Sequence, residues 1–216
     1  GTNTDSNGKG LFKYAPPSGF LALCEDNLPA PAIADPGDYF KTVLYDGDGN
    51  TRGHSITGVG FQPDLVWIKV RNQTGYYHEL HDSVRGAGKA IFSNISDVES
   101  TIDTVRSFDT NGFTVALQSG LNGTNQSGKD YVAWCWEAGG GSNTFNVDGT
   151  GYATASAAGI TEGSIALTGA SVNTTAGFSI VSYTGTGANA TVGHGLGKAP
   201  KLIIVKNRDS VTEWPV

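Results

Sequence analysis

The chain has 216 residues, a net charge of −6 and only 16% charged residues. Its length is sufficient to bury a core, and a hydrophobic content of 38% is too high for a disordered chain. The acidic balance and the lack of a Lys/Arg cluster argue against a nucleic-acid partner, because phosphates require clustered cations. No run of 18 apolar residues occurs, so we expect no membrane span.

The composition points to β-structure with many turns. Glycine alone contributes 31 residues, and Thr, Ser and Asn are also frequent. Two cysteines are too few for a disulfide framework. Cys135 lies in the apolar run Tyr-Val-Ala-Trp-Cys-Trp, which predicts a free, buried thiol.

In chain order, residues 1–38 are expected to form an extended lead-in, or the end of a preceding domain, with one strand at most. An internal repeat follows, because residues 39–71 match residues 177–208 at an offset of 137 to 140. The matched pairs include Tyr45 and Tyr183, His54 and His194, Pro63 and Pro200, Leu65 and Leu202, Lys69 and Lys206, and Arg71 and Arg208.

The repeat sets the expected domain organisation. Residues 39–140 form a first β repeat, 141–176 a Gly/Ser/Thr-rich linker with short strands, and 177–216 the start of a truncated second repeat. A short helical turn is predicted near 97–104. Alternation and apolar runs predict strands at 40–46, 53–58, 64–70, 76–81, 89–94, 105–109, 112–118, 130–137, 178–183, 190–195 and 201–207.

These elements predict an all-β fold, with mostly antiparallel β-sandwich modules and a truncated second repeat. An incomplete repeat would expose unpaired edges, which favour aggregation. We therefore expect strands within 178–207 to close against the first repeat or against a neighbouring chain.

Several motifs of the first repeat resemble a module repeated in virion and tail-fibre-like proteins of tailed phages, chiefly marine and cyanobacterial phages. They are Lys69-x-Arg71-Asn72, Asp82-Ser-Val-Arg-Gly-Ala87, Ser93-Asn94, Ser107-Phe108, Gly112-Phe-Thr-Val115 and Tyr131-Val-Ala-Trp134. Residues 10–31 are similar to the closing strand of a concanavalin-like (SPRY-type) domain that often precedes this module. The resemblance implies a structural protein of the virion, an extracellular particle, and implies no catalytic residue.

Asp46-Gly-Asp48-Gly-Asn50 has the alternating oxygens of a calcium loop. Asp-Gly and Gly-Asn pairs are also typical of hairpin turns, and Thr51 and Thr57 replace the Gly and Glu of an EF-hand. The second repeat keeps the turn but loses the ligands. We favour a turn, and the sequence leaves calcium binding open.

Four histidines suggest metal or catalytic chemistry at first sight. His54 and His194 recur after glycine, which favours a hydrogen-bonded structural role over a metal ligand. His78 and His81 are three residues apart, so a strand cannot direct both side chains at one metal. Asp82 and Arg85 are expected to form a structural ion pair across a turn. Because none of these histidines has the arrangement of a metal or catalytic site, we expect no metal or other cofactor.

Aromatic residues are the best candidates for ligand contact. Trp134 and Trp136 share one strand face with Val132, where we favour burial over a sugar platform. Trp67 aligns with Ile204, so its position calls for apolar bulk. Tyr76, Tyr77 and Trp214 lie in less regular stretches and are the candidate ligand-binding residues, for a sugar or a neighbouring chain.

The expected function is a non-enzymatic structural or adhesive module of a phage appendage (tail fibre, spike or capsid decoration) that presents loops to a host-surface glycan. Its partners would be other virion proteins and copies of itself, with a trimer as one possibility. Two alternatives are a purely structural spacer and a polysaccharide-degrading glycosidase with two carboxylates. No spacing singles out a catalytic pair among Glu79, Asp97, Glu99, Asp103 and Glu137.

Overall fold

The computed structural model describes residues 1–118 and 123–216, which form two compact units, residues 1–34 and residues 35–216. The first unit contains a single antiparallel bridge, between Asn3 and Phe12, and the 3-10 turn η1 (Glu25–Asn27). The Asp5 carboxylate organises it by accepting hydrogen bonds from the amides of Asn7, Lys9 and Ala22 and from Nδ2 of Asn27. Residues 1–34 thus form a lead-in without a ladder strand.

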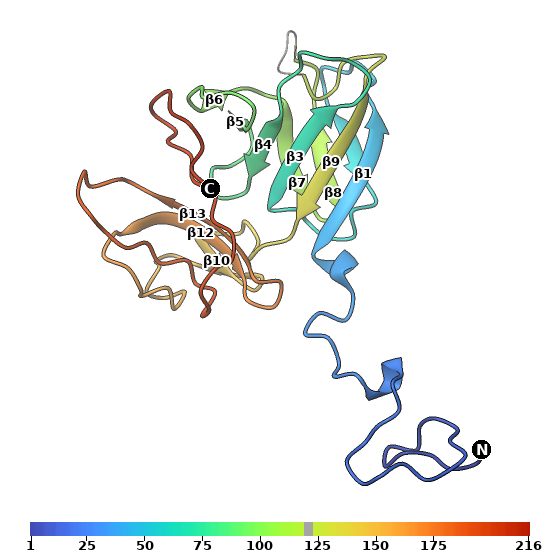
Figure 1. The fold of residues 1–216 in the computed structure, drawn as a ribbon. Helices are drawn as coiled ribbons and strands as arrows, with labels where there is room; N and C mark the ends of the chain where they lie inside the picture. Colours follow the sequence, from blue (N-terminus) through green and yellow to red (C-terminus); the bar gives the residue numbers. More distant parts are fainter. Residues whose placement is uncertain (119–122) are drawn as a thin grey trace. The chain divides into compact units, whose positions relative to one another are not determined.

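The second unit contains an antiparallel six-stranded sheet in the order β1-β9-β3-β4-β5-β6 (Figure 1). A 3-10 turn, η2 (Pro36–Asp38), precedes it. Its strands are β1 (Phe40–Asp46), β3 (Leu65–Val70), β4 (Glu79–Asp82), β5 (Lys89–Phe92), β6 (Ser100–Thr101) and β9 (Asp130–Trp136). The central strand β9 separates β1 from β3, so segments far apart in sequence are joined.

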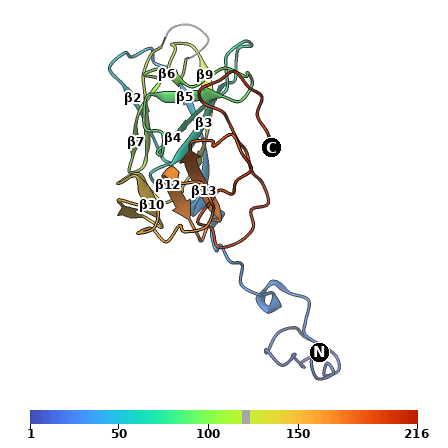
Figure 2. The ribbon, with the colours of Figure 1, turned by 90° about the vertical axis from the view of Figure 1, so that its left-hand side faces the viewer.

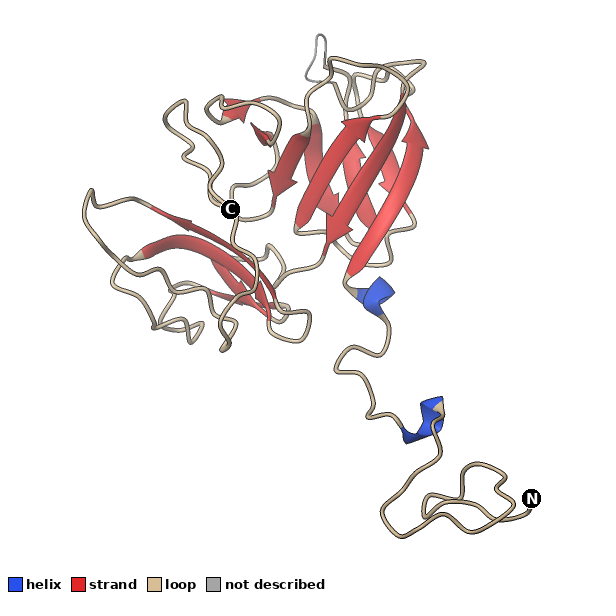
Figure 3. Cartoon of the chain, viewed as in Figure 1, coloured by secondary structure: helices blue, strands red, loops and turns tan. Residues whose placement is uncertain are grey.

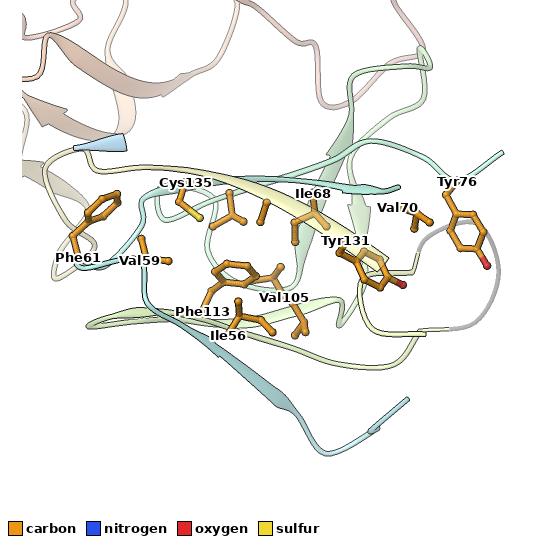
Figure 4. Close-up of a cluster of buried hydrophobic side chains, with 13 residues drawn as sticks. Ile56, Val59, Phe61, Ile68, Val70, Tyr76, Val105, Phe113, Tyr131 and Cys135 are labelled. Carbon is orange, nitrogen blue, oxygen red and sulfur yellow. The ribbon is translucent and has the colours of Figure 1, made fainter. Parts of the chain in front are cut away.

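A three-stranded antiparallel sheet in the order β2-β8-β7 packs against it and completes the β-sandwich. Its strands are β2 (His54–Thr57), β7 (Val105–Asp109) and β8 (Gly112–Val115). Figure 4 shows the core between the two sheets, where Phe113 and Tyr131 are fully buried. Alternation along β9 directs Tyr131, Ala133 and Cys135 into this core. The all-β sandwich prediction is confirmed.

A separate four-stranded sheet in the order β11-β10-β12-β13 has its own apolar cluster around Phe145 and Val172. Its strands are β10 (Phe145–Val147), β11 (Thr150–Tyr152), β12 (Leu167–Asn173) and β13 (Phe178–Tyr183). The β10–β11 hairpin turns through Asp148 and Gly149, whose φ angles of 49° and 81° are those that an Asp-Gly turn favours. The predicted linker therefore supplies three strands to a sheet that β13 completes.

Most strand predictions match the structure, and 40–46, 105–109 and 178–183 match to the residue. The helical turn near 97–104 is wrong, since this stretch contains β6 instead. The strands predicted at 190–195 and 201–207 are also wrong, because these stretches are loop apart from a bridge at Val192 (Figure 3). The predicted strand 112–118 ends at Val115, before residues 119–122.

The equivalent stretches of the first repeat are strands because each has ladder partners from elsewhere in the chain. There β2 pairs with β8, and β3 pairs with β9 and β4. Among the described residues, no strand pairs with 190–195 or 201–207 in this way, so their apolar pattern alone does not make them strands.

The segment after β13 is nevertheless attached to the first repeat, where it lies beside the β5 region (Figure 2). Lys206 Nζ donates to the carbonyl of Ser96, and the Thr212 amide donates to the same oxygen. Arg208 forms an ion pair with Glu99. The strands expected within 178–207 therefore do not close against the first repeat: β13 pairs with β12, and the later segment contacts the first repeat only through side chains and loops.

No helix in the described part of the chain is long and apolar enough to cross a membrane.

Candidate functional site

The ends of three neighbouring strands lie at a hollow of the second unit. Tyr39 precedes β1, Glu137 follows β9 and Asp64 precedes β3. Ladder-type hydrogen bonds hold them in register, from the Glu137 amide to the Tyr39 carbonyl at 2.9 Å and from the Asp64 amide to the Trp136 carbonyl at 2.8 Å. Antiparallel pairing thus gathers these three side chains at one end of the sheet.

An open groove of about 630 Å³ lies at this end. It is also lined by Asn173, the last residue of β12, and by Asp148 and Thr175 in the turns that follow β10 and β12. A second hollow of about 510 Å³ shares Tyr39 and Glu137 with it. We call the larger hollow the Glu137 groove; its lining residues are Tyr39, Gln62, Asp64, Glu137, Ala138, Gly140, Gly141, Ser142, Asp148, Gly149, Asn173 and Thr175.

Asp64 is the buried carboxylate of the groove. Its Oδ2 accepts hydrogen bonds from the amides of Ala138 and Gly140, at 2.8 and 2.9 Å. The Ser83 hydroxyl lies beside the carboxylate but outside good hydrogen-bond geometry for Oδ1. Burial raises the pKa of Asp64 above its ordinary value, and these hydrogen bonds only partly oppose the rise.

Glu137 is half-buried and carries the second carboxylate. Burial, together with the negative charges of Asp64 and Asp38, raises its pKa. Its Oε2 has a long contact of 3.4 Å from Asn173 Nδ2. The groove therefore presents carboxylate, amide and hydroxyl groups, which can hydrogen-bond a polyhydroxylated ligand.

Aromatic residues gather on the sheet face away from the core, outside the lining of the groove. Trp136 contacts Phe40 at 5.0 Å between ring centroids and stacks on Phe178 at 6.2 Å. Trp67 and Trp134 meet edge to face at 5.9 Å. Trp134 and Trp136 share this face with Val132, as predicted, and are half-buried, so the expected burial is only partial.

The structure buries one of the three predicted ligand-binding residues and leaves the other two half-buried. Tyr76 is buried in the sandwich core and donates a hydrogen bond to Gln126, so the expectation that it is exposed is wrong. Tyr77 packs on Phe92 at 5.4 Å between centroids. Trp214 is half-buried, and its indole N–H contacts the carbonyls of Phe92 and Ile95, so it attaches the end of the chain.

His54, His194 and the Asp46–Asn50 turn are held by hydrogen bonds within the fold. His54 Nδ1 is 3.1 Å from Asn125 Oδ1, and His194 Nδ1 accepts from the Leu196 amide. Asp48 Oδ1 accepts from the Asn50 amide and from Asn125 Nδ2. Among the described residues, no group of three or more His, Cys, Asp or Glu side chains could hold a metal ion. Asp46 is exposed at the end of β1.

The remaining acidic candidates are held in separate interactions. Glu79 contacts buried His81 at 3.2 Å, and Asp103 pairs with Arg106. Asp82 pairs with Arg85, as predicted, and Arg85 also contacts Glu99. Asp97 is exposed.

Sequence reasoning missed Asp64, although the repeat contains a signal for it. Pro63 and Leu65 recur as Pro200 and Leu202, but Lys201 stands where the first repeat has Asp64. The repeated strand therefore does not require this carboxylate, which indicates a role particular to the first repeat.

The fold and the groove define an all-β sandwich protein with an open, acidic, polar groove at one end of its central sheet. The chain belongs to the family of a domain of unknown function (DUF7483), whose model matches residues 35–216. The match coincides with the second compact unit and includes both repeats. No curated protein and no solved structure matches the chain.

Proposed function

We propose that the chain is a non-enzymatic adhesive module of a phage virion appendage and that the Glu137 groove contacts a host-surface glycan. The observation that carries this proposal is the convergence of Tyr39, Glu137 and Asn173 on one open groove; Phe40 and Trp136, the sequence neighbours of Tyr39 and Glu137, are in ring contact. Carboxylates and amides can hydrogen-bond sugar hydroxyls, while aromatic rings pack on the apolar faces of sugars.

The virion setting rests on the resemblance of the repeated motifs to phage modules. An open groove gives weak binding for each copy, and several copies on one particle would supply avidity. Copies of the chain and other virion proteins are the partners that this arrangement requires.

Binding of the 216-residue protein to host cells and to their purified surface polysaccharide tests the proposal. We expect retention that is reduced at least tenfold by Glu137→Ala and by Tyr39→Ala. Asp209→Ala is the matched control, because Asp209 is exposed and lies outside the groove. Equal retention of all variants, or no retention of the wild type, would contradict the glycan role and favour a structural spacer.

A specific observation supports the second candidate, a glycosidase. Asp64 and Glu137 line the same groove, and the pKa of each is raised, as a general acid requires. Such an enzyme would release reducing sugar from the polysaccharide, and Asp64→Asn and Glu137→Gln would abolish the release. Retention without release distinguishes the adhesive module from the enzyme.

A further inference from the structure

The charged residues that line the Glu137 groove are all acidic. They are Asp64, Glu137 and Asp148, and the described lining residues include no Lys, Arg or His. The adjoining hollow shares Glu137 and adds two further aspartates and one cation, Lys41. A hollow whose charges have one sign attracts ligands of the opposite sign and repels ligands of its own.

Among the described residues, only neutral groups donate hydrogen bonds to these three carboxylates. The Thr174 amide and hydroxyl donate to the two oxygens of Asp148, at 2.8 and 2.7 Å. Two backbone amides donate to Asp64, and Asn173 makes the long contact with Glu137. No ion pair in the described part of the chain includes any of the three. The negative charge of the groove is therefore not compensated by a neighbouring cation.

Asp64 is a second, independent sign that a ligand completes the groove. It is 0% exposed, and its Oδ1 has no hydrogen-bond partner among the described residues. The hydroxyl of Ser83 beside it also has none. A carboxylate oxygen that is buried without a partner is costly, because it has lost water and gained nothing in exchange. Since Asp64 lines the groove, a cation bound in the groove would stabilise its charge.

Glu137 is the carboxylate that such a cation can reach. It is half-buried, whereas Asp64 is fully buried. Burial, followed by repulsion from Asp64 and Asp38, raises the pKa of Glu137. A positive group within hydrogen-bond distance would oppose this repulsion and favour the ionised carboxylate.

We propose that the Glu137 groove binds glycans whose sugars carry a free, protonated amine, with Glu137 as the direct partner of the ammonium group. This inference rests on the glycan-binding role proposed above and specifies the class of sugar. A primary ammonium has three N–H donors and no acceptor, which suits a groove whose charged groups are all acceptors. Tyr39 and Asn173 line the same groove and would contact the sugar hydroxyls. Sugars that carry carboxylates would be repelled.

Two sugars that differ only at their nitrogen test the proposal. A β-1,4-linked trimer of glucosamine carries a free amine on each sugar, whereas the trimer of N-acetylglucosamine carries none. Each is titrated calorimetrically into the full 216-residue protein at pH 6, where the free amines are largely protonated. We expect the glucosamine trimer to bind at least tenfold more tightly.

Charge-neutral variants locate the preference. Glu137→Gln keeps the shape of the side chain and removes its charge, so the preference for the free amine should fall to about threefold or less. Asp64→Asn keeps an oxygen for the two backbone amides and should also reduce the preference, with circular dichroism as the check of folding. Glu213→Gln is the matched control, because Glu213 is exposed and lies outside the groove.

Equal affinities for the two sugars, including no measurable binding of either, would overturn the proposal. An equal loss of affinity in Glu137→Gln and Glu213→Gln would also overturn it, since the attraction would then come from the net charge of −6. A capped trilysine peptide that binds as tightly as the glucosamine trimer would indicate a protein partner instead and overturn it too. Failure of the glycan role itself is distinguishable, because the wild type would then not be retained on the host polysaccharide.

Discussion

Arg208 donates two hydrogen bonds to the Glu99 carboxylate, from Nε at 2.8 Å and from Nη2 at 2.9 Å, across 109 residues of sequence. Arg85 contacts the same carboxylate, so Glu99 joins the C-terminal segment to the β4–β5 region. We expect Arg208→Ala to increase hydrogen exchange at residues 206–215 and to lower the free energy of unfolding by about 1 kcal/mol or less, as for partly exposed ion pairs.

Arg71→Ala is the matched control for this variant. Arg71 is the counterpart of Arg208 in the first repeat, and its side chain is exposed. Unchanged exchange at residues 206–215 in Arg208→Ala would show that Trp214 and Lys206 hold the segment without the ion pair.

The same carboxylate predicts how acid affects the C-terminal segment. Burial alone would raise the pKa of Glu99, but hydrogen bonds and charges from Arg208 and Arg85 outweigh it and lower the pKa below its ordinary 4.5. The ionised pair therefore stabilises the folded protein above pH 4.5, and this contribution is lost as the pH falls through the lowered pKa. Exchange at residues 206–215 should rise there in the wild type, whereas in Glu99→Gln it should be high already at pH 7.

Much of the sandwich could be predicted because its strands carry strict alternation. Tyr131, Ala133 and Cys135 face the core as the period of two requires, and Val132 and Trp134 face the other way. Residues 202–205 have an equally strong strand pattern but are loop. A strand forms only with a ladder partner, and a local pattern carries no information about whether that partner is present.

The candidate site was harder to predict because a local sequence pattern does not show which strands are neighbours in the sheet. Tyr39, Asp64 and Glu137 lie in three separate parts of the sequence, and only the order β1-β9-β3 brings them together. Tyr76 was misjudged because its stretch is irregular, although irregular backbone can also place a ring in a core. The repeat comparison at Asp64 and Lys201 was the available signal for the groove.

Thiol reactivity tests the placement of the two cysteines. Both are free, and Cys135 is 0% exposed whereas Cys24 is half-exposed. Burial raises the pKa of the Cys135 thiol to about 12, so almost no thiolate forms at pH 8. We expect a thiol-specific reagent to modify Cys24 within minutes in the native protein and Cys135 only after unfolding. Cys24→Ser should abolish the fast reaction, and rapid modification in that variant would contradict the buried position.

The side-chain amide of Asn125 is expected to contribute to the stability of the folded protein. It is fully buried, and its amide group links Asp48, the Asn50 carbonyl and His54. Asn125→Ala leaves these groups without partners, so we expect a loss of roughly 1–3 kcal/mol in urea unfolding. Asn72→Ala, at an exposed position, should cost less.

Calcium is not expected to bind at the Asp46–Asn50 turn, where the side-chain amide of Asn125 already donates to Asp48. Asp48 already accepts two hydrogen bonds, and these bonds outweigh its burial and lower its pKa. We therefore expect the Tm to be the same in calcium and in EDTA. A Tm that rises with calcium would identify the residues of the Asp46–Asn50 turn as ligands after all.

The raised pKa of Glu137 predicts an unusual pH dependence at the groove. Because the folded protein disfavours the ionised form, this group costs stability above its folded pKa, and the cost disappears as the pH falls below the ordinary carboxyl value. Glu137→Gln should therefore stabilise the protein at pH 7 by less than about 1 kcal/mol, since the side chain is partly open to water, and by little at pH 4. Glu213→Gln, at an exposed position, should change neither value. Destabilisation by Glu137→Gln at pH 7 would instead mean that the ionised carboxylate is held by Asn173, whose Nδ2 lies 3.4 Å from Oε2.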